Sequence, residues 1–193
     1  MQRKTLITTL LLTSFVISLL FTVRNYVSHK VEEAEKIIDI KFNELSLSDR
    51  KEVECLADNI FFESANEPKD GKIAVGLVTM NRVKYGREFG SSVCTVVKQK
   101  AHNSQGVMVC QFSWWCNMKA KFMSIHKDKS LSEQQKEMYG EIRDLALYVY
   151  LNYDTIRDKT KGALFFHADY VNPHWDYKHT VTIGKHIFYS IND

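Results

Sequence analysis

Apolar positions divide the chain into an uncharged N-terminal run, a charged stretch, and a longer region with helical and strand patterns. The run Thr5–Val23 carries no charge. As a helix at about 1.5 Å per residue it would be roughly 28 Å long, close to the hydrocarbon thickness of a bilayer. Arg3 and Lys4 precede the run and favour a cytoplasmic N-terminus. The pattern therefore predicts one transmembrane signal-anchor within residues 1–23. A cleaved signal peptide is the alternative, although no A-x-A-like cleavage site follows.

Residues 24–45 are charged and mixed in character, and we expect a partly helical stalk there. The domain itself is expected to occupy residues 46–193. This order predicts a single-pass protein of the inner (cytoplasmic) membrane, with its N-terminus inside and its domain on the periplasmic or extracytoplasmic side.

The first part of the domain has the period of an amphipathic helix. Apolar and small residues recur at i, i+3, i+4 and i+7 from Val53 onward. Ser46 or Ser48 is a suitable N-cap, and Pro68 is expected to end the helix within a residue or two. Asp70 is a candidate cap for the helix that follows.

Further helices are expected in the middle of the chain. Gly86 is a natural stop for the second helix, and Ser91–Ser92 can start a short third one. Ser130–Glu133 has the form of a capping box and precedes a long helical pattern. Between them, the turn residues and aromatics of His102–Met118 predict an ordered loop with short extended pieces.

The C-terminal end changes to β-branched and aromatic residues, in ALFFHADYV and HTVTIGKHIFYS. Gly184–Lys185 separates two such runs and fits a two-residue hairpin turn. The expected fold class is therefore α+β: a mostly helical domain with a small C-terminal antiparallel hairpin.

Composition and charge limit the possible partners. The chain has 193 residues, of which 45% are hydrophobic and 25% charged, which is enough for one domain with a substantial core. The formal net charge is +3. Without a long basic patch, this charge is too weak to indicate a nucleic-acid partner.

The cysteines all follow the predicted anchor and form no C-x-x-C pair. An even number of cysteines beyond an export signal favours two disulfides over a zinc or redox motif. Three pairings remain open, and four buried free thiols are the alternative. The candidates are Cys55, Cys94, Cys110 and Cys116.

A carboxylate in the first helix of the domain is the main candidate for catalysis. Glu63 follows three large apolar residues and falls beside Leu56, on the flank of the apolar face. Partial burial raises the pKa of such a carboxyl, so that it keeps a proton near neutral pH and can give it to a leaving oxygen. The alternative is a boundary residue that points into solvent. Glu67, one turn further on, is interpreted as solvated or as a cap of a nearby amide.

We expect no metal or organic cofactor. The chain has no H-E-x-x-H motif, no glycine-rich phosphate loop and no G-x-S-x-G elbow. His167, His174 and His179 cluster in sequence beside two aspartates, but rim or structural histidines are a better interpretation than metal ligands. Aromatic residues next to polar ones, as in CQFSWWCN, suit the binding of sugar rings.

Five segments together resemble one family, the SleB-type cell wall hydrolases. They are ECLADNIFFESANEP, GKIAVGLVTMNRV, SSVCTVVKQ, CQFSWWCN and ALFFHADYVNPHW, in the order of the family's own motifs. The resemblance covers about Glu54 to Trp175. It implies a lysozyme-like helical fold and cleavage of peptidoglycan glycan strands at the β-1,4 MurNAc-GlcNAc bond, by a lytic transglycosylase or a muramidase-like hydrolase.

The resemblance also implies roles for individual residues. The catalytic acid of the family's FEA triplet corresponds to Glu63, although Ser64 replaces the alanine. A lytic transglycosylase needs no enzymic nucleophile, because the 6-hydroxyl of the sugar itself attacks the anomeric carbon. We predict that the wall of the substrate groove and a supporting polar position are supplied by Gln111, Ser113, His167, Tyr170 and, as the support, Asn81.

Two alternatives belong to other classes. A non-catalytic, membrane-anchored wall-binding or lysis-regulating protein would keep the same fold, and the departures from the family's motif around Glu63 favour it. A metal-dependent peptidase or amidase would use the region 167–179.

Overall fold

The computed structural model describes the backbone of residues 2–102, 106–116 and 132–192, and the side chains of these residues except 2–12 and 35. The chain divides into two units, Met1–Leu45 and Ser46–Asp193, and we describe each by itself.

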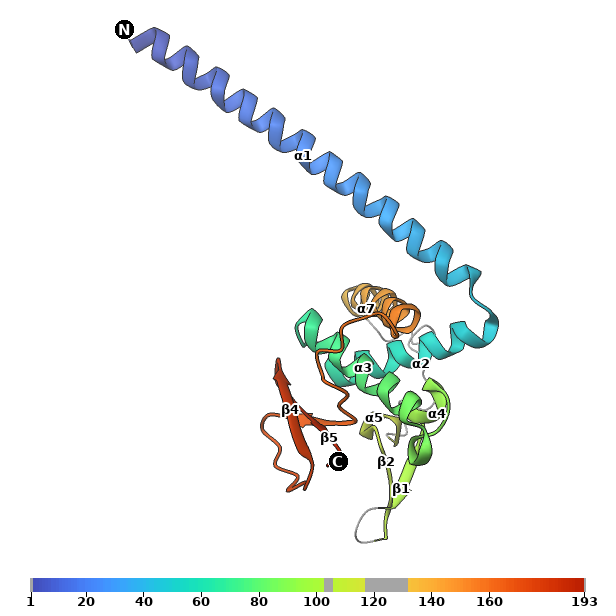
Figure 1. Ribbon diagram of the computed structural model, residues 1–193. Coiled ribbons are helices and arrows are strands. Elements are labelled where there is room, and N and C mark those ends of the chain that lie inside the picture. The colour runs from blue at the N-terminus through green and yellow to red at the C-terminus, as the bar shows by residue number, and fades with distance from the viewer. Residues whose placement is uncertain (1, 103–105, 117–131, 193) are drawn as a thin grey trace. The chain divides into compact units, whose positions relative to one another are not determined.

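The first unit contains a single long helix, α1 (Gln2–Glu44) (Figure 1). Among the described residues, no helix is long and apolar enough to cross a membrane. The prediction of an N-terminal transmembrane signal-anchor is therefore wrong, and so is the single-pass location in the inner membrane that depended on it.

The second unit is mostly helical, as predicted. Two antiparallel helices of similar length are followed by short helical segments and then by one long helix. The segments are α2 (Leu47–Ser64), α3 (Lys69–Tyr85), η1 (Arg87–Phe89), α4 (Val93–Val97), α5 (Ser113–Cys116) and α7 (Glu133–Asn152).

The helix α2 begins and α3 ends at predicted residues. The hydroxyl of Ser46 accepts the backbone N–H of Asp49 at 3.1 Å and so caps α2. Gly86 ends α3 with a φ of 64°, a left-handed conformation that glycine adopts without steric cost.

Two other predicted caps are wrong. The N-cap of α3 is Pro68, and Asp70 lies inside the first turn, where its negative charge still favours the helix dipole. The capping box of α7 pairs Ser132 with Gln135, two residues later than predicted. Ser130, the predicted cap, lies outside the described residues.

The strands form two separate antiparallel sheets. β1 (Lys100–His102) pairs with β2 (Met108–Cys110). β2 lies in the segment His102–Met118, where short extended pieces were predicted, whereas β1 only ends at its first residue. The other sheet has the order β3-β5-β4, with bounds Phe165–Ala168, His186–Ser190 and Lys178–Ile183. The predicted hairpin is confirmed, since Gly184–Lys185 connects β4 to β5, and β3 extends it to three strands. The second unit is thus an α+β domain.

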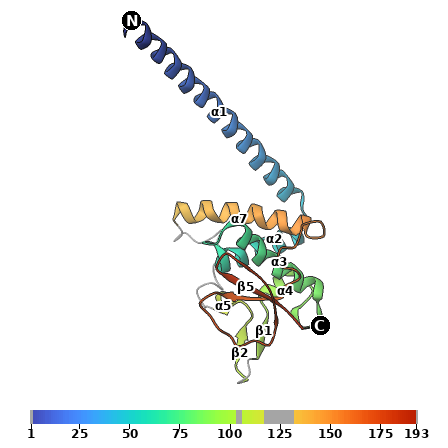
Figure 2. The ribbon, with the colours of Figure 1, turned by 60° about the vertical axis from the view of Figure 1, so that its left-hand side comes forward.

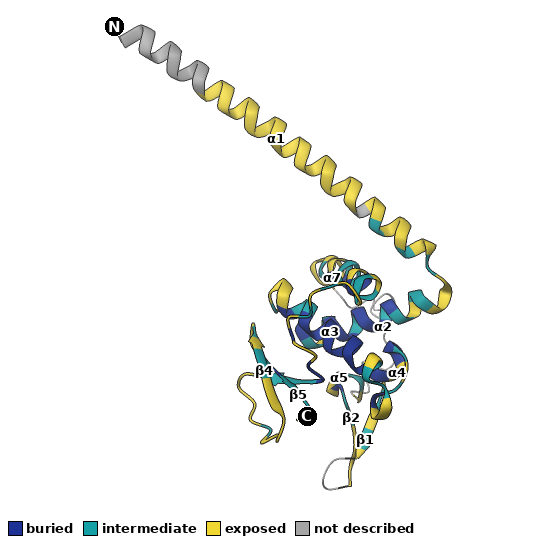
Figure 3. Cartoon of the chain, viewed as in Figure 1, coloured by how far each residue is buried: buried dark blue, intermediate teal, exposed yellow. Residues whose placement is uncertain are grey.

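The core of the domain lies around α2, which packs against α3, α4 and α7. Figure 2 shows α7 lying across α2 and α3, and Figure 3 shows the buried residues concentrated on α2, α3 and α4. Leu56, Ile60, Leu77 and Val149 are fully buried there, and burial of one such side chain contributes about 1.5–3 kcal/mol.

One face of the three-stranded sheet packs against α3 and completes the core there. Phe188 of β5 is fully buried against Ala74 and Val78 of α3, and Phe166 of β3 packs beside it. This contact brings the C-terminal strands to the helices, although they are far apart in the chain.

All four cysteines form disulfides, as predicted. Cys55 of α2 pairs with Cys94 of α4, which follows it by 39 residues. Cys110 pairs with Cys116, which follows it by 6 residues and closes the turn between β2 and α5. The first bond restricts the unfolded chain more, because it closes the longer loop.

Candidate functional site

The carboxyl of Glu63 lies at the end of α2, in the wall of a cavity of about 260 Å³. The side chain is half-buried. The cavity brings the end of α2 together with residues of the C-terminal sheet, and its lining includes Phe62, Glu63, Glu67, Tyr170, Lys185 and His186.

Burial controls the protonation of Glu63. Loss of contact with water raises the pKa of this carboxyl from 4.5 to about 7, and the positive charge of Arg82 partly opposes the rise. An acid with a pKa near neutrality exchanges its proton readily at working pH, as general acid–base catalysis requires.

Arg82 is a buried cation that sequence reasoning missed. Only 4% of it is exposed. Its Nε donates to the carbonyl oxygen of Leu164 at 2.7 Å, and its Nη1 has no hydrogen-bond partner among the described residues. Burial lowers its pKa to about 10, although the charge of Glu63 counteracts that shift. The signal was present in the sequence, because Arg82 follows Val75 and Val78 with the spacing of the buried face of α3.

Three aromatic rings surround this guanidinium group. The Arg82 carbon Cζ lies 4.9 Å from the ring centroid of Phe112, 5.0 Å from that of Phe89 and 5.6 Å from that of Phe165. Cation–π contacts of this kind compensate in part for the lost hydration of a buried charge.

Glu67 has a different partner, the backbone of the hairpin turn. Its Oε2 accepts the N–H of Lys185 at 2.8 Å. This contact agrees with the interpretation of Glu67 as a cap of a nearby amide.

His186 lines the cavity, and sequence reasoning missed it as well. It is 7% exposed, and burial lowers its pKa, against a smaller opposing effect of Glu67. Its ring packs edge-on against Phe166, with centroids 5.1 Å apart. This shift favours the neutral imidazole.

Of the residues predicted to line the groove, Tyr170 lines the same cavity as Glu63 and is 86% exposed. His167, on β3, is not among the lining residues. Its Nδ1 donates to the carbonyl oxygen of Ala168 at 2.8 Å, and its Nε2 accepts the hydroxyl of Tyr189 at 2.9 Å. His167 is thus held within the sheet.

Gln111 and Ser113 lie on the neighbouring segment around α5 and do not line the cavity either. That segment approaches α2 through Trp114, whose ring stacks on Phe62 with centroids 4.5 Å apart. The Trp114 Nε1 donates to Asn59 Oδ1 at 2.9 Å. The stack places a half-exposed aromatic surface one residue away from Glu63.

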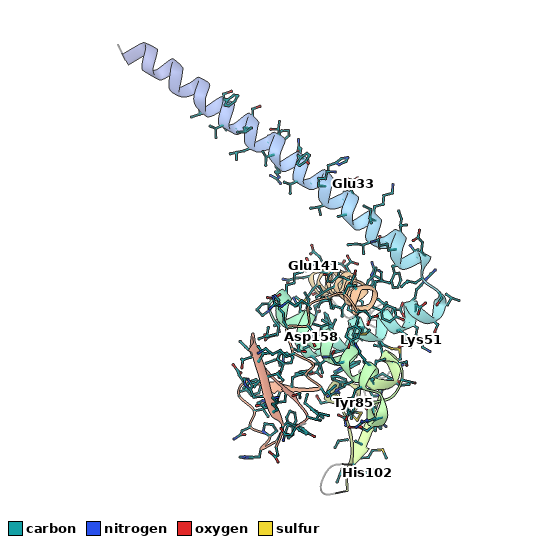
Figure 4. All side chains as sticks on the ribbon, in the orientation of Figure 1. Glu33, Lys51, Tyr85, His102, Glu141 and Asp158 are labelled. Carbon is teal, nitrogen blue, oxygen red and sulfur yellow. A yellow bond between two sulfur atoms is a disulfide. The ribbon has the colours of Figure 1, made fainter. Side chains whose placement is uncertain are left out.

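Asn81 is separate from Glu63 and lines a larger cavity of about 780 Å³. Its Nδ2 donates to Asp158, labelled in Figure 4, and to the carbonyl oxygen of Ala163, both at 3.1 Å. Its Oδ1 accepts the hydroxyl of Tyr153 at 2.8 Å. These bonds hold the segment between α7 and β3, so Asn81 supports the fold at a distance from the cavity of Glu63.

The region 167–179, which a metal-dependent peptidase or amidase would use, includes residues of the three-stranded sheet. His179 lies on β4, with its ring edge-on to Tyr189 at 5.8 Å between centroids. Across the part of the chain that the structure describes, no three His, Cys, Asp or Glu side chains are grouped as ligands for a metal ion.

Comparison with solved structures finds two SleB proteins. The chain has 21% identity to the catalytic domain of the Bacillus cereus SleB protein and a TM-score of 0.44, covering 73% of this chain and 91% of that one. It has the same identity and TM-score with the catalytic domain of the germination-specific lytic transglycosylase SleB from Bacillus anthracis, covering 77% and 98%. Among curated proteins, none matches the chain.

A family model provides the assignment. The cell wall hydrolase family matches residues 66–189, a range that includes Glu67, Arg82 and His186 and begins three residues after Glu63. Since the match covers more than half of the chain, this protein belongs to the cell wall hydrolase family, whose substrate is peptidoglycan.

Proposed function

We propose that this protein cleaves the glycan strands of peptidoglycan at the β-1,4 MurNAc-GlcNAc bond, with Glu63 as the general acid and then the general base. One observation carries the proposal: Glu63 lies in the wall of an open cavity with a carboxyl pKa raised to about 7 by burial. Below that pH the carboxyl holds the proton that a leaving sugar oxygen requires.

The proposed reaction moves one proton out and one proton back. Glu63 gives its proton to the bridging glycosidic oxygen as the bond from that oxygen to the anomeric carbon breaks. The 6-hydroxyl of the same sugar then attacks the anomeric carbon, and the Glu63 carboxylate takes up the hydroxyl proton. The products are a free hydroxyl on the released strand and a 1,6-anhydro sugar, and Glu63 is protonated again.

The surroundings of Glu63 support a mechanism with one carboxyl group. The positive charge of Arg82 favours the carboxylate that forms when the proton leaves. Glu67, the other carboxylate of the cavity, accepts the amide of Lys185. We therefore favour transglycosylation over a reaction that needs a second carboxyl as nucleophile or base.

Mass spectrometry of the products of purified peptidoglycan tests the proposal. The wild type should release muropeptides with anhydro ends, whereas a hydrolase would leave reducing ends. Glu63→Gln should bind the wall and keep its circular dichroism spectrum, but release no muropeptides. Release at the wild-type rate by Glu63→Gln would contradict the role of Glu63. A wild type that binds the wall and releases nothing would support the non-catalytic alternative.

A further inference from the structure

The side chain of Glu67 occupies a recess between the start of α3 and the β4–β5 turn. Its backbone N–H donates to the carbonyl oxygen of Ser64 at 2.9 Å, at the end of α2. Its carboxylate accepts the backbone N–H of Lys185, 118 residues further along the chain. Glu67 therefore joins the end of the helix that carries Glu63 to the turn of the sheet.

Two glycines from different elements make room for this side chain. A Cβ atom on Gly71, in the first turn of α3, would lie 3.0 Å from the Cβ and 3.4 Å from Oε2 of Glu67. A Cβ atom on Gly184 would overlap Oε2 itself. Gly184 also has a φ of 58°, which side chains rarely adopt. The recess is thus formed from both sides and fits a carboxylate that approaches the backbone closely.

The same turn supplies part of the cavity wall next to Glu63. Lys185 and His186 both line that cavity, and they follow Gly184 directly. Lys185 and Glu67 are charged groups of the cavity besides Glu63, and Arg82 acts on Glu63 from α3. If the turn moved away from α2, the cavity would widen and water would reach Glu63.

We propose that Glu67 is a positioning residue, which clamps the β4–β5 turn onto the end of α2 and so holds Lys185 and His186 in the wall of the glycan-binding cavity. This inference depends on the proposed function of that cavity. Glu67 acts here through the turn and exchanges no proton with the substrate.

The first experiment compares Glu67→Gln with Glu67→Leu in steady-state cleavage of purified peptidoglycan. The amide oxygen of glutamine can still accept the Lys185 N–H, so Glu67→Gln should keep kcat/KM within about threefold of the wild type. Leucine leaves that N–H unpaired and releases the turn. Because displacement of binding groups by about 1 Å can cost 10²-fold, Glu67→Leu should lose at least about tenfold, mainly through KM.

The second experiment uses a matched pair of glycines. Gly184→Ala places a methyl group where the Glu67 carboxylate lies, on a backbone with positive φ. Gly162 has a φ of 77° and nothing within 4 Å of an added Cβ. Gly162→Ala therefore has similar backbone strain without contact with Glu67. Gly184→Ala should reproduce the loss seen in Glu67→Leu, and Gly162→Ala should not.

The pH dependence of kcat/KM distinguishes a positioning role of Glu67 from a simple loss of stability. Water entering the widened cavity would lower the pKa of Glu63 toward its ordinary value. The descending limb of kcat/KM should therefore move to lower pH in Glu67→Leu and Gly184→Ala, and stay in place in Gly162→Ala. Thermal unfolding confirms that each variant is folded at the assay temperature.

Three results would overturn the inference: loss of activity in Glu67→Gln as large as in Glu67→Leu, wild-type kinetics in Glu67→Leu, or a pH limb that none of the variants moves. The first would indicate that the charge of Glu67 acts in the reaction itself. None of these results resembles failure of the proposed function, which would show as activity in Glu63→Gln.

Discussion

Glu63 and Glu67 are four residues apart where α2 ends, and both line the same cavity. Their carboxyl groups nevertheless have different surroundings. Glu63 is shielded from water, and this burial raises the pKa of its carboxyl to about 7. The Oε2 of Glu67 accepts a hydrogen bond from a backbone amide of the sheet turn.

The comparison shows that two carboxyls close together in the chain can have different chemical roles. Over four residues of the chain, the surroundings of a carboxyl change from a site shielded from water to a site with a backbone hydrogen-bond donor. The first environment raises the pKa of the acid, and the second provides a hydrogen bond that joins two elements of the fold. A motif with two acids therefore does not imply a catalytic pair.

The largest expected effect comes from removing the exchangeable proton. Glu63→Gln keeps the size of the side chain but cannot donate a proton, so kcat should fall by about 10²–10⁴-fold, the usual contribution of general acid–base catalysis. Glu67→Gln should retain most of the activity in the same assay. Equal losses in the two variants would abolish the distinction between the two carboxyls.

The next effect concerns the charge that opposes the raised pKa. Replacing Arg82 by methionine removes a positive charge that lowers the pKa of Glu63. The acid then stays protonated to higher pH, and the descending limb of the rate profile should move up by about one pH unit. Arg82→Lys keeps the charge and should leave the limb close to the wild-type position. A limb that does not move in Arg82→Met would show that Arg82 does not influence Glu63.

A third prediction concerns stability rather than rate. The folded state raises the pKa of Glu63 from 4.5 to about 7, so between these values the folded protein holds a proton that the unfolded chain has lost. The stability of the wild type should therefore fall as the pH rises through this window. Glu63→Gln lacks this dependence and should be more stable than the wild type at pH 8, by about 1–3 kcal/mol.

Urea denaturation of the two proteins at pH 4 and at pH 8 measures this difference. At pH 4 the wild-type carboxyl is mostly protonated in both states, so the difference in unfolding free energy between the two proteins should be smaller than at pH 8. A gap that is the same at both pH values would show that burial does not raise the pKa of Glu63. Glu67→Gln should show no gain in stability at pH 8, because the amide oxygen of glutamine can still accept the N–H of Lys185.

Local sequence signals predicted much of the fold. The Ser46 cap, the Gly86 stop and the Gly184–Lys185 turn each depend on a few neighbouring residues, and the structure confirms all three. The misplaced caps show the limit of such signals. Where Ser, Asp and Pro compete within a few residues, as before α3, the final choice depends on how the helix packs.

The cavity was harder to predict because its two walls are far apart in the chain. Periodicity put Glu63 at the flank of the apolar face, where it is found. No pattern connected Glu67 with Lys185, since a contact across 118 residues depends on how the sheet docks on α3. Tyr170 shares the cavity with Glu63, but the other predicted groove residues, Gln111, Ser113 and His167, lie outside its wall.

The smallest expected effect comes from another acid of α2, Asp58, which tests whether a raised pKa alone identifies the catalytic group. Burial raises the pKa of Asp58 to about 6, but its Oδ1 accepts the hydroxyl of Tyr139 at 2.8 Å, and it is not among the residues of the cavity. Asp58→Asn keeps an acceptor for that hydroxyl, so kcat/KM should stay within about threefold of the wild type. The same peptidoglycan assay measures it beside Glu63→Gln. A loss as large as that of Glu63→Gln would mean that a place in the cavity wall does not identify the catalytic acid. The roles given to Glu63 and Asp58 would then be wrong.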